Sequence, residues 1–190
     1  MSRRPDPDVE DRILNAALRL YQKGGEKALT MRGVARIAHT NTPTVYRRFK
    51  NRRDILFALT QRVRDDLVKT LEPSRSPEET CVKYIQFAST HPYEYGLFYM
   101  HILELPQSIR AHRRSGLWST AELIRKQLAE QLGGSPVEHT RLSLGLWALA
   151  HGTATLLHSN ALPKHRLGEL YAAFSAAVDA LLSEGRRARP

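Results

Sequence analysis

Basic side chains, which can bind phosphates, are concentrated between residues 36 and 53 of this 190-residue chain. The interval holds no acidic residue, and its six basic residues are Arg36, Arg47, Arg48, Lys50, Arg52 and Arg53. So many neighbouring positive charges repel one another unless phosphates or other anions neutralise them. A solvated basic surface would explain the same charges, so charge alone leaves both nucleic-acid binding and a bare basic surface open.

Two short segments of helical periodicity position these cations. In the first, apolar residues recur at helical spacing after Thr30, whose hydroxyl is suited to cap a helix over roughly residues 30–38. The second helix starts near Thr42; Asn41 is its cap, and Pro43 falls in its first turn, where a missing N–H is tolerated. Two short helices joined by a tight turn predict a helix-turn-helix, whose second helix fits the DNA major groove.

Charge is distributed unevenly along the chain. Residues 1–71 contain 16 Lys and Arg against 8 Asp and Glu, whereas residues 72–190 contain 13 against 11. This division predicts a nucleic-acid module joined to a module with another task. The predicted domains are a DNA-binding helix-turn-helix domain over 1–50, with a flexible arm over 1–7, a helical regulatory and dimerisation domain over 51–184, and a flexible basic tail over 185–190.

Nothing in the chain suggests strands, disulfides or a membrane. The single cysteine, Cys81, can form no intramolecular disulfide, and no apolar run approaches the ~20 residues of a membrane span. The N-terminus lacks the apolar core of a signal peptide. We therefore expect a cytoplasmic protein with no membrane partner.

The periodicity predicts an all-α fold of about nine or ten helices. One helix runs from Asp8 to about Lys23 and stops at Gly24-Gly25, and another starts at Asn51 and continues until Pro73. The later predicted ranges are 77–90, 92–104, 106–112, 115–132, 136–159 and 164–184.

The last two predicted helices, 136–159 and 164–184, are rich in small residues, which let helices approach closely. The residues expected to line them are Gly145, Ala148, Gly152 and Thr155 on the first and Leu170, Ala173, Phe174, Ala177, Ala180 and Leu181 on the second. Two such pairs could form a four-helix homodimer interface, which would place two reading helices on one DNA site. Packing within a single monomer is the alternative.

The N-terminal pattern resembles a known family over roughly residues 9–56. It is similar to the DNA-binding domain of the tetracycline-repressor (TetR) family at Ile13-Leu14, Ala16-Ala17, Leu20, Thr30, Val34-Ala35, Ala38, Thr44-Val45-Tyr46, Phe49 and Arg52. The resemblance implies a homodimeric, ligand-responsive transcription factor, usually a repressor. In it three N-terminal helices bind DNA, and a small molecule in a divergent helical domain alters the spacing of the two DNA-binding heads.

Four positions depart from the family pattern. His39 occupies a turn position where the family commonly has glycine, and a left-handed conformation there would cost about 1 kcal/mol or more. Pro43 replaces a frequent glycine and should stiffen the helix start. Asn41 replaces serine as a cap, and Arg52 replaces lysine with the charge kept.

Chemistry and resemblance together assign the contacts with double-stranded DNA. Arginine can hold guanine through two hydrogen bonds, and threonine and proline carbons can pack on a thymine methyl, so base edges are assigned to Thr42, Pro43 and Arg47. Phosphate contacts are assigned to Thr30, Thr44, Tyr46, Arg48, Lys50 and Arg52. A half-buried packing role for Tyr46 and a hydrogen bond within its own helix for Thr44 are the structural alternatives.

The C-terminal body carries aromatic and polar groups suited to a small apolar effector with one or two polar anchors. The candidate ligand contacts are Tyr95, Phe98, Tyr99, His101, Glu104, Trp118, Trp147 and His151. Aromatic residues at helical spacing also form ordinary cores, so an open pocket and a closed core both remain possible. Trp147-x-x-x-His151-Gly152 resembles the Trp-His-Gly signature of one TetR subgroup, and His91-Pro92 with Tyr95 to Met100 resembles the helix before it.

Catalysis, a metal and a cofactor are not expected. The chain has no nucleophile elbow, phosphate-cradling glycine loop or paired-carboxylate motif, and no His or acid pair has the spacing of a known metal site. The expected function is a DNA-binding regulator, most simply a repressor that is released from its operator by a small molecule. The alternatives are an architectural or constitutive DNA-binding protein without small-molecule control and, more remotely, a small helical enzyme.

Overall fold

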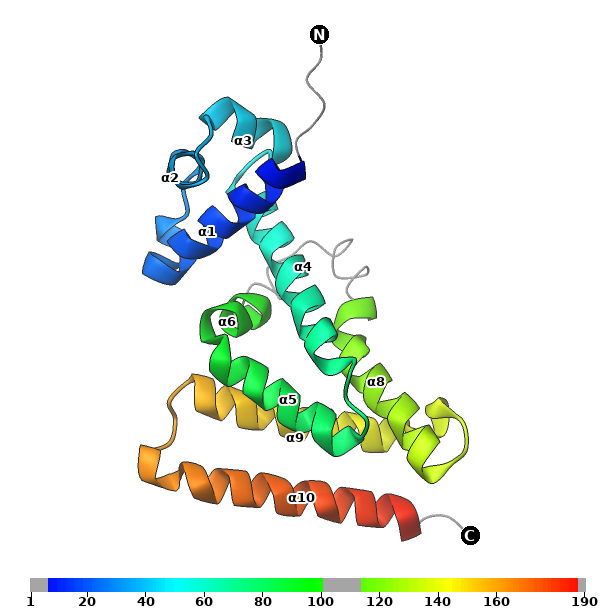
Figure 1. The fold of residues 1–190 in the computed structure, drawn as a ribbon. Helices are drawn as coiled ribbons and strands as arrows, with labels where there is room; N and C mark the ends of the chain where they lie inside the picture. The colour runs from blue at the N-terminus through cyan, green and yellow to red at the C-terminus, as the bar shows by residue number, and fades with distance from the viewer. Residues whose placement is uncertain (1–6, 101–113, 188–190) are drawn as a thin grey trace. The chain divides into compact units, whose positions relative to one another are not determined.

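The computed structural model describes residues 7–100 and 114–187. Within these ranges the chain forms nine α-helices, two short 3-10 helices and no strand, which confirms the all-α prediction (Figure 1). The chain divides into two compact units, residues 1–63 and 64–190, with the division inside a helix. The functional division at residue 50 remains a prediction.

The first unit contains three helices and the first part of a fourth: α1 (Pro7–Ala28), α2 (Met31–Ile37), α3 (Thr42–Arg48) and α4 (Arg52–Leu71). Its core is made by apolar side chains from all four helices, which are almost fully buried: Ile13, Ala17, Val34, Val45, Phe49, Ile55 and Leu59. Gly24 and Gly25 leave helical geometry at the predicted stop, although a further turn continues to Ala28.

Both predicted caps of the helix-turn-helix are present. The Thr30 hydroxyl accepts a hydrogen bond from the Gly33 N–H at 3.0 Å, and Asn41 Oδ1 accepts one from the Thr44 N–H at 2.8 Å. Each bond satisfies a backbone donor that the first turn of a helix leaves without a partner. The two caps therefore fix where α2 and α3 begin.

His39, in the turn between α2 and α3, has φ 51°, so the left-handed conformation expected there is present. We predict that His39→Gly raises the free energy of unfolding by about 0.5 kcal/mol, because glycine relieves the strain but gains entropy in the unfolded chain. Urea unfolding followed by circular dichroism measures this change. Asn160, also at φ 51°, is the matched control, since asparagine tolerates this conformation and Asn160→Gly should gain less.

The second unit contains the rest of α4 and five further α-helices: α5 (Pro77–Thr90), α6 (Pro92–Met100), α8 (Arg114–Leu132), α9 (Thr140–His158) and α10 (Leu167–Arg187). The central helix is α9, which packs against α5, α8 and α10. A buried polar bridge also ties this unit together: Thr80 donates to Gln127 Oε1 and Gln127 donates to the Ser74 carbonyl, both at 2.8 Å.

Several predicted boundaries in this unit differ from the structure. The range 136–159 is divided, because the residues from Pro136 to His139 form a 3-10 turn before α9. The last predicted helix, 164–184, extends further, since α10 continues through Arg187 with Gly185 closely packed against Leu142. The predicted helix at 106–112 lies outside the described residues. Among the helices of the described ranges, none has the length and apolar character needed to cross a membrane.

Candidate functional site

One face of α3 is open to solvent and the other is buried. Val45 and Phe49 face the core, whereas Pro43 and Arg47 are exposed and Tyr46 is 52% exposed. Tyr46 therefore keeps about half of its surface buried, which fits both a phosphate contact and the packing alternative. The exposed face offers a hydroxyl, a guanidinium and an apolar ring, which are groups that can contact base edges and phosphates.

Arg47 is held along its own helix by Thr44. Its Nη2 donates to Thr44 Oγ1 at 2.8 Å. Thr44 is therefore engaged within its helix, as the structural alternative for this residue anticipated. The bond uses one of the five guanidinium N–H donors, so four remain for an outside acceptor.

The exposed ends of α2 and α3 border a shallow depression of about 760 Å³. Its lining includes two arginines and several hydroxyl or amide side chains and consists of Thr30, Arg32, Gly33, Ala35, Arg36, Thr40, Asn41, Thr42 and Pro43. Arg32 was not among the predicted contacts, although its place two residues after the cap Thr30 puts it in the first turn of α2. The depression brings Thr30, Thr42 and Pro43 together on one surface, beside Arg32 and Arg36.

Two of the arginines predicted to contact DNA phosphates are already paired with acidic residues. Arg48 Nη1 lies 3.3 Å from Glu10 Oε2, and Arg52 Nη2 lies 2.7 Å from Glu26 Oε1. Exposed pairs of this kind typically stabilise a fold by about 0–1 kcal/mol. Both arginines therefore form ion pairs with α1 before any DNA is bound, and these pairs were not predicted from the sequence. Lys50, by contrast, has an exposed side chain, and its backbone N–H donates to Asp54 Oδ2 at 2.9 Å.

A second group of interacting side chains lies in the second unit, around His151 on α9. Tyr84 on α5 and Tyr95 on α6 place their hydroxyls 3.1 and 2.9 Å from His151 Nδ1. The Tyr84 hydroxyl also hydrogen-bonds the Tyr99 hydroxyl, and Trp147 stacks on His151 with ring centroids 5.8 Å apart. We call these five residues the tyrosine–histidine cluster.

Burial sets the protonation states in the tyrosine–histidine cluster. Removal from water lowers the pKa of His151 and raises the pKa of Tyr84, Tyr95 and Tyr99, because burial disfavours every charged form. At neutral pH the imidazole is therefore uncharged and its Nδ1 can accept a hydrogen bond from a tyrosine hydroxyl. Tyr95 also lies 3.3 Å from Thr155 Oγ1, so its hydroxyl has a second partner.

The structure brings together four of the predicted ligand contacts: Tyr95, Tyr99, Trp147 and His151. Phe98 is buried and packs edge-on against Tyr99. Tyr84 was missed, because nothing in the spacing of α5 distinguishes it from a core residue. His101 and Glu104 lie outside the described residues, as does the side chain of Trp118.

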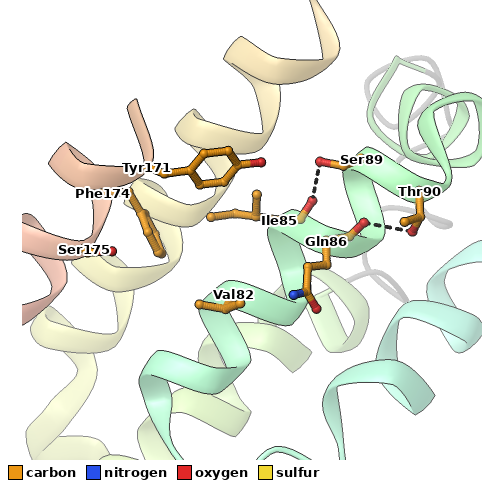
Figure 2. A pocket seen from close by; sticks show the side chains of 8 residues that line it. All are labelled: Val82, Ile85, Gln86, Ser89, Thr90, Tyr171, Phe174 and Ser175. Atoms are coloured by element: carbon orange, nitrogen blue, oxygen red, sulfur yellow. Dashed lines mark hydrogen bonds between the residues drawn. The ribbon is translucent and has the colours of Figure 1, made fainter. Parts of the chain in front are cut away.

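A cavity of about 390 Å³ lies between α5 and α10, apart from the predicted contacts (Figure 2). Its lining consists of Val82, Ile85, Gln86, Ser89, Thr90, Tyr171, Phe174 and Ser175. Tyr171 reaches from α10 toward Ser89 on α5, whose hydroxyl donates to the Ile85 carbonyl at 3.0 Å (Figure 2). The walls are mainly apolar and carry no charged side chain. This cavity could not be predicted from the sequence, because α5 and α10 are distant in the chain.

Two family models match the chain. Residues 13–59 match the model of bacterial regulatory proteins of the tetR family, and residues 78–181 match that of the tetracyclin repressor-like C-terminal domain. No curated protein sequence matches the chain. The second model leaves the Trp-His-Gly subgroup untested, so that assignment remains a prediction.

Solved structures with the same fold come from several bacteria. A protein of unknown function from Rhodococcus sp. RHA1 is 21% identical, with a TM-score of 0.73, over 95% of this chain and 97% of that one. A TetR/AcrR-family transcriptional regulator from Thermobifida fusca is 20% identical, with a TM-score of 0.66, over 92% and 97%. A TetR transcriptional regulator from Streptomyces coelicolor is 17% identical, with a TM-score of 0.66, over 94% and 97%.

At these identities the structures establish the fold, and the family models establish the relationship. The matches extend over the helix-turn-helix and over most of the helical body. TetR regulators bind DNA and are not enzymes. The chain belongs to the TetR family of transcriptional regulators.

Proposed function

We propose that this regulator is a cytoplasmic repressor that binds a palindromic operator as a homodimer and leaves it when a small molecule binds. The observation that carries the DNA part is the exposed face of α3, where Pro43, Tyr46 and Arg47 point away from the core. A single helix of seven residues offers few base contacts, so a two-fold partner that reads a second half-site is favoured.

The dimer proposal is supported by exposed surface on α9 and α10 that packing within one chain does not cover. The two helices do pack on each other, since a side-chain carbon added at Gly145 would lie 3.7 Å from Leu181 and Phe174 is buried. Phe174 is thus used in packing within one chain, whereas Gly145 and Leu181 stay partly exposed. Of the small residues expected at the interface, Ala148, Gly152 and Thr155 on α9 and Ala173 and Ala180 on α10 stay exposed.

We place the effector at the tyrosine–histidine cluster. A half-buried neutral imidazole with two tyrosine hydroxyls near one nitrogen can rearrange its hydrogen bonds, because Nδ1 of a neutral ring has one lone pair. A ligand hydroxyl or carbonyl could replace one of these partners. The cavity between α5 and α10 is the competing location, and it would accept an uncharged, mainly apolar molecule.

A thermal-shift screen of small molecules, followed by displacement of labelled DNA, tests the proposal. We expect compounds that stabilise the chain and release it from DNA. Tyr95→Phe should weaken their binding about two- to tenfold, since it removes one neutral hydrogen bond. Tyr171→Phe, in the α5/α10 cavity, is the matched control and should leave binding unchanged.

The outcomes separate the alternatives. A larger loss of ligand binding in Tyr171→Phe than in Tyr95→Phe would move the effector to the α5/α10 cavity. A screen that yields no stabilising compound, with DNA binding intact, would favour a constitutive DNA-binding protein.

A further inference from the structure

Two acidic residues of α1 hold two of the cations assigned to DNA phosphates. Glu10 pairs with Arg48 at the end of α3, 38 residues along the chain, and Glu26 pairs with Arg52 at the start of α4, 26 residues along. Arg52 also donates to the Glu26 carbonyl at 3.4 Å. The fold, rather than helical spacing, brings each carboxylate to its arginine.

Both pairs are reachable from solvent. The Arg48 and Glu10 side chains are 26% and 48% exposed, and those of Arg52 and Glu26 are 46% and 36% exposed. A phosphate that approaches either guanidinium therefore finds a carboxylate already bound to that guanidinium. Like charges repel, so the phosphate must share or displace the carboxylate.

Arg47 provides the contrast. Among the described residues its guanidinium bonds to the neutral Thr44 hydroxyl, and no carboxylate pairs with it. The arginine assigned to base edges thus keeps its full charge, whereas two arginines assigned to phosphates are neutralised within the fold.

We propose that Glu10 and Glu26 are positioning residues that limit the sequence-independent affinity for DNA by competing with phosphates for Arg48 and Arg52. The proposal rests on the assignment of these two arginines to phosphates. Sequence-independent affinity comes almost entirely from neutralised phosphates, so each arginine held by an acid removes part of it. Discrimination between sequences then depends more heavily on the base contacts of α3.

Glu26→Gln is the direct test, with the full chain and a short fluorescent duplex of random sequence. Anisotropy titrations over a range of NaCl concentrations give the affinity and its salt dependence. Freeing one cation should steepen the slope of the logarithm of the association constant against the logarithm of the NaCl concentration by up to about 0.9. The affinity for DNA should rise roughly three- to eightfold near 0.1 M salt. Glu10→Gln should act in the same direction through Arg48.

Matched controls separate the pair from a general change of charge. Glu169→Gln makes the same charge change on α10, where Glu169 pairs with Arg166 at 3.2 Å, and should have a much smaller effect. In an Arg52→Gln background, Glu26→Gln should lose most of its effect, because the cation that it frees is gone.

The proposal is overturned if Glu26→Gln and Glu10→Gln change the affinity and the slope no more than Glu169→Gln does. It is also overturned if they weaken binding, since the carboxylates would then be orienting the arginines toward DNA. If thermal unfolding shows that the Glu26→Gln protein is not folded, the DNA affinity of the Glu10→Gln protein tests the proposal instead. A wild-type chain that binds no duplex would overturn the assignment of DNA contacts itself, which is a distinguishable result.

Discussion

Replacing Arg47 with alanine is expected to lower affinity for the operator by about 1 to 3 kcal/mol and to relax the base preference at one position of each half-site. Arg47 is exposed on α3, and its bond to Thr44 leaves four N–H donors for a base. Two of them can hold guanine O6 and N7 in the major groove. The change is measured by selecting bound duplexes from a random pool with the wild type and the variant, then titrating the selected operator.

The matched control for this variant is Arg166→Ala. It removes the same charge from the second unit, where Arg166 pairs with Glu169. We expect it to leave the selected sequence unchanged. An Arg47→Ala protein that selects the wild-type sequence with the wild-type affinity would show that Arg47 does not contact a base.

Gly152→Arg is expected to give a folded monomer whose affinity for the operator falls about 10²- to 10⁴-fold. A Cβ added at Gly152 would have no atom of the described residues within 4 Å, and arginine favours helix more than glycine does, so the monomer should tolerate it. In a dimer the same side chain would separate the two copies of α9. The loss follows because two linked heads bind far more tightly than one.

Gly168→Arg supplies the control for the dimer. A Cβ added at Gly168 would likewise have no described neighbour within 4 Å, but Gly168 lies off the row formed by Ala173 and Ala180 on α10. Light scattering after size-exclusion chromatography should show a dimer for Gly168→Arg and a monomer for Gly152→Arg. A dimer in both variants would place the interface elsewhere.

The sequence was sufficient to predict the local features of the helix-turn-helix. A cap and its partner lie three residues apart, so Thr30 and Asn41 could be recognised from spacing alone. The left-handed turn at His39 was expected from the position that the family usually fills with glycine.

Contacts between distant segments could not be predicted in this way. The pair of Glu10 with Arg48 depends on how α1 crosses α3, and no pattern in either helix encodes that crossing. Tyr84 has the spacing of a core residue, and only the folded second unit brings its hydroxyl to His151. The burial of Phe174 within one chain could not be predicted for the same reason, since small and apolar stripes look alike whether they pack within one chain or between two.

We expect two copies of α3 to read the two halves of one DNA site. Selection of duplexes from a random pool by the purified protein tests this expectation. We predict enrichment of an inverted repeat whose half-sites are centred about 10 base pairs, or a multiple of that distance, apart. Enrichment of a single unrepeated site, or of no sequence at all, would contradict it.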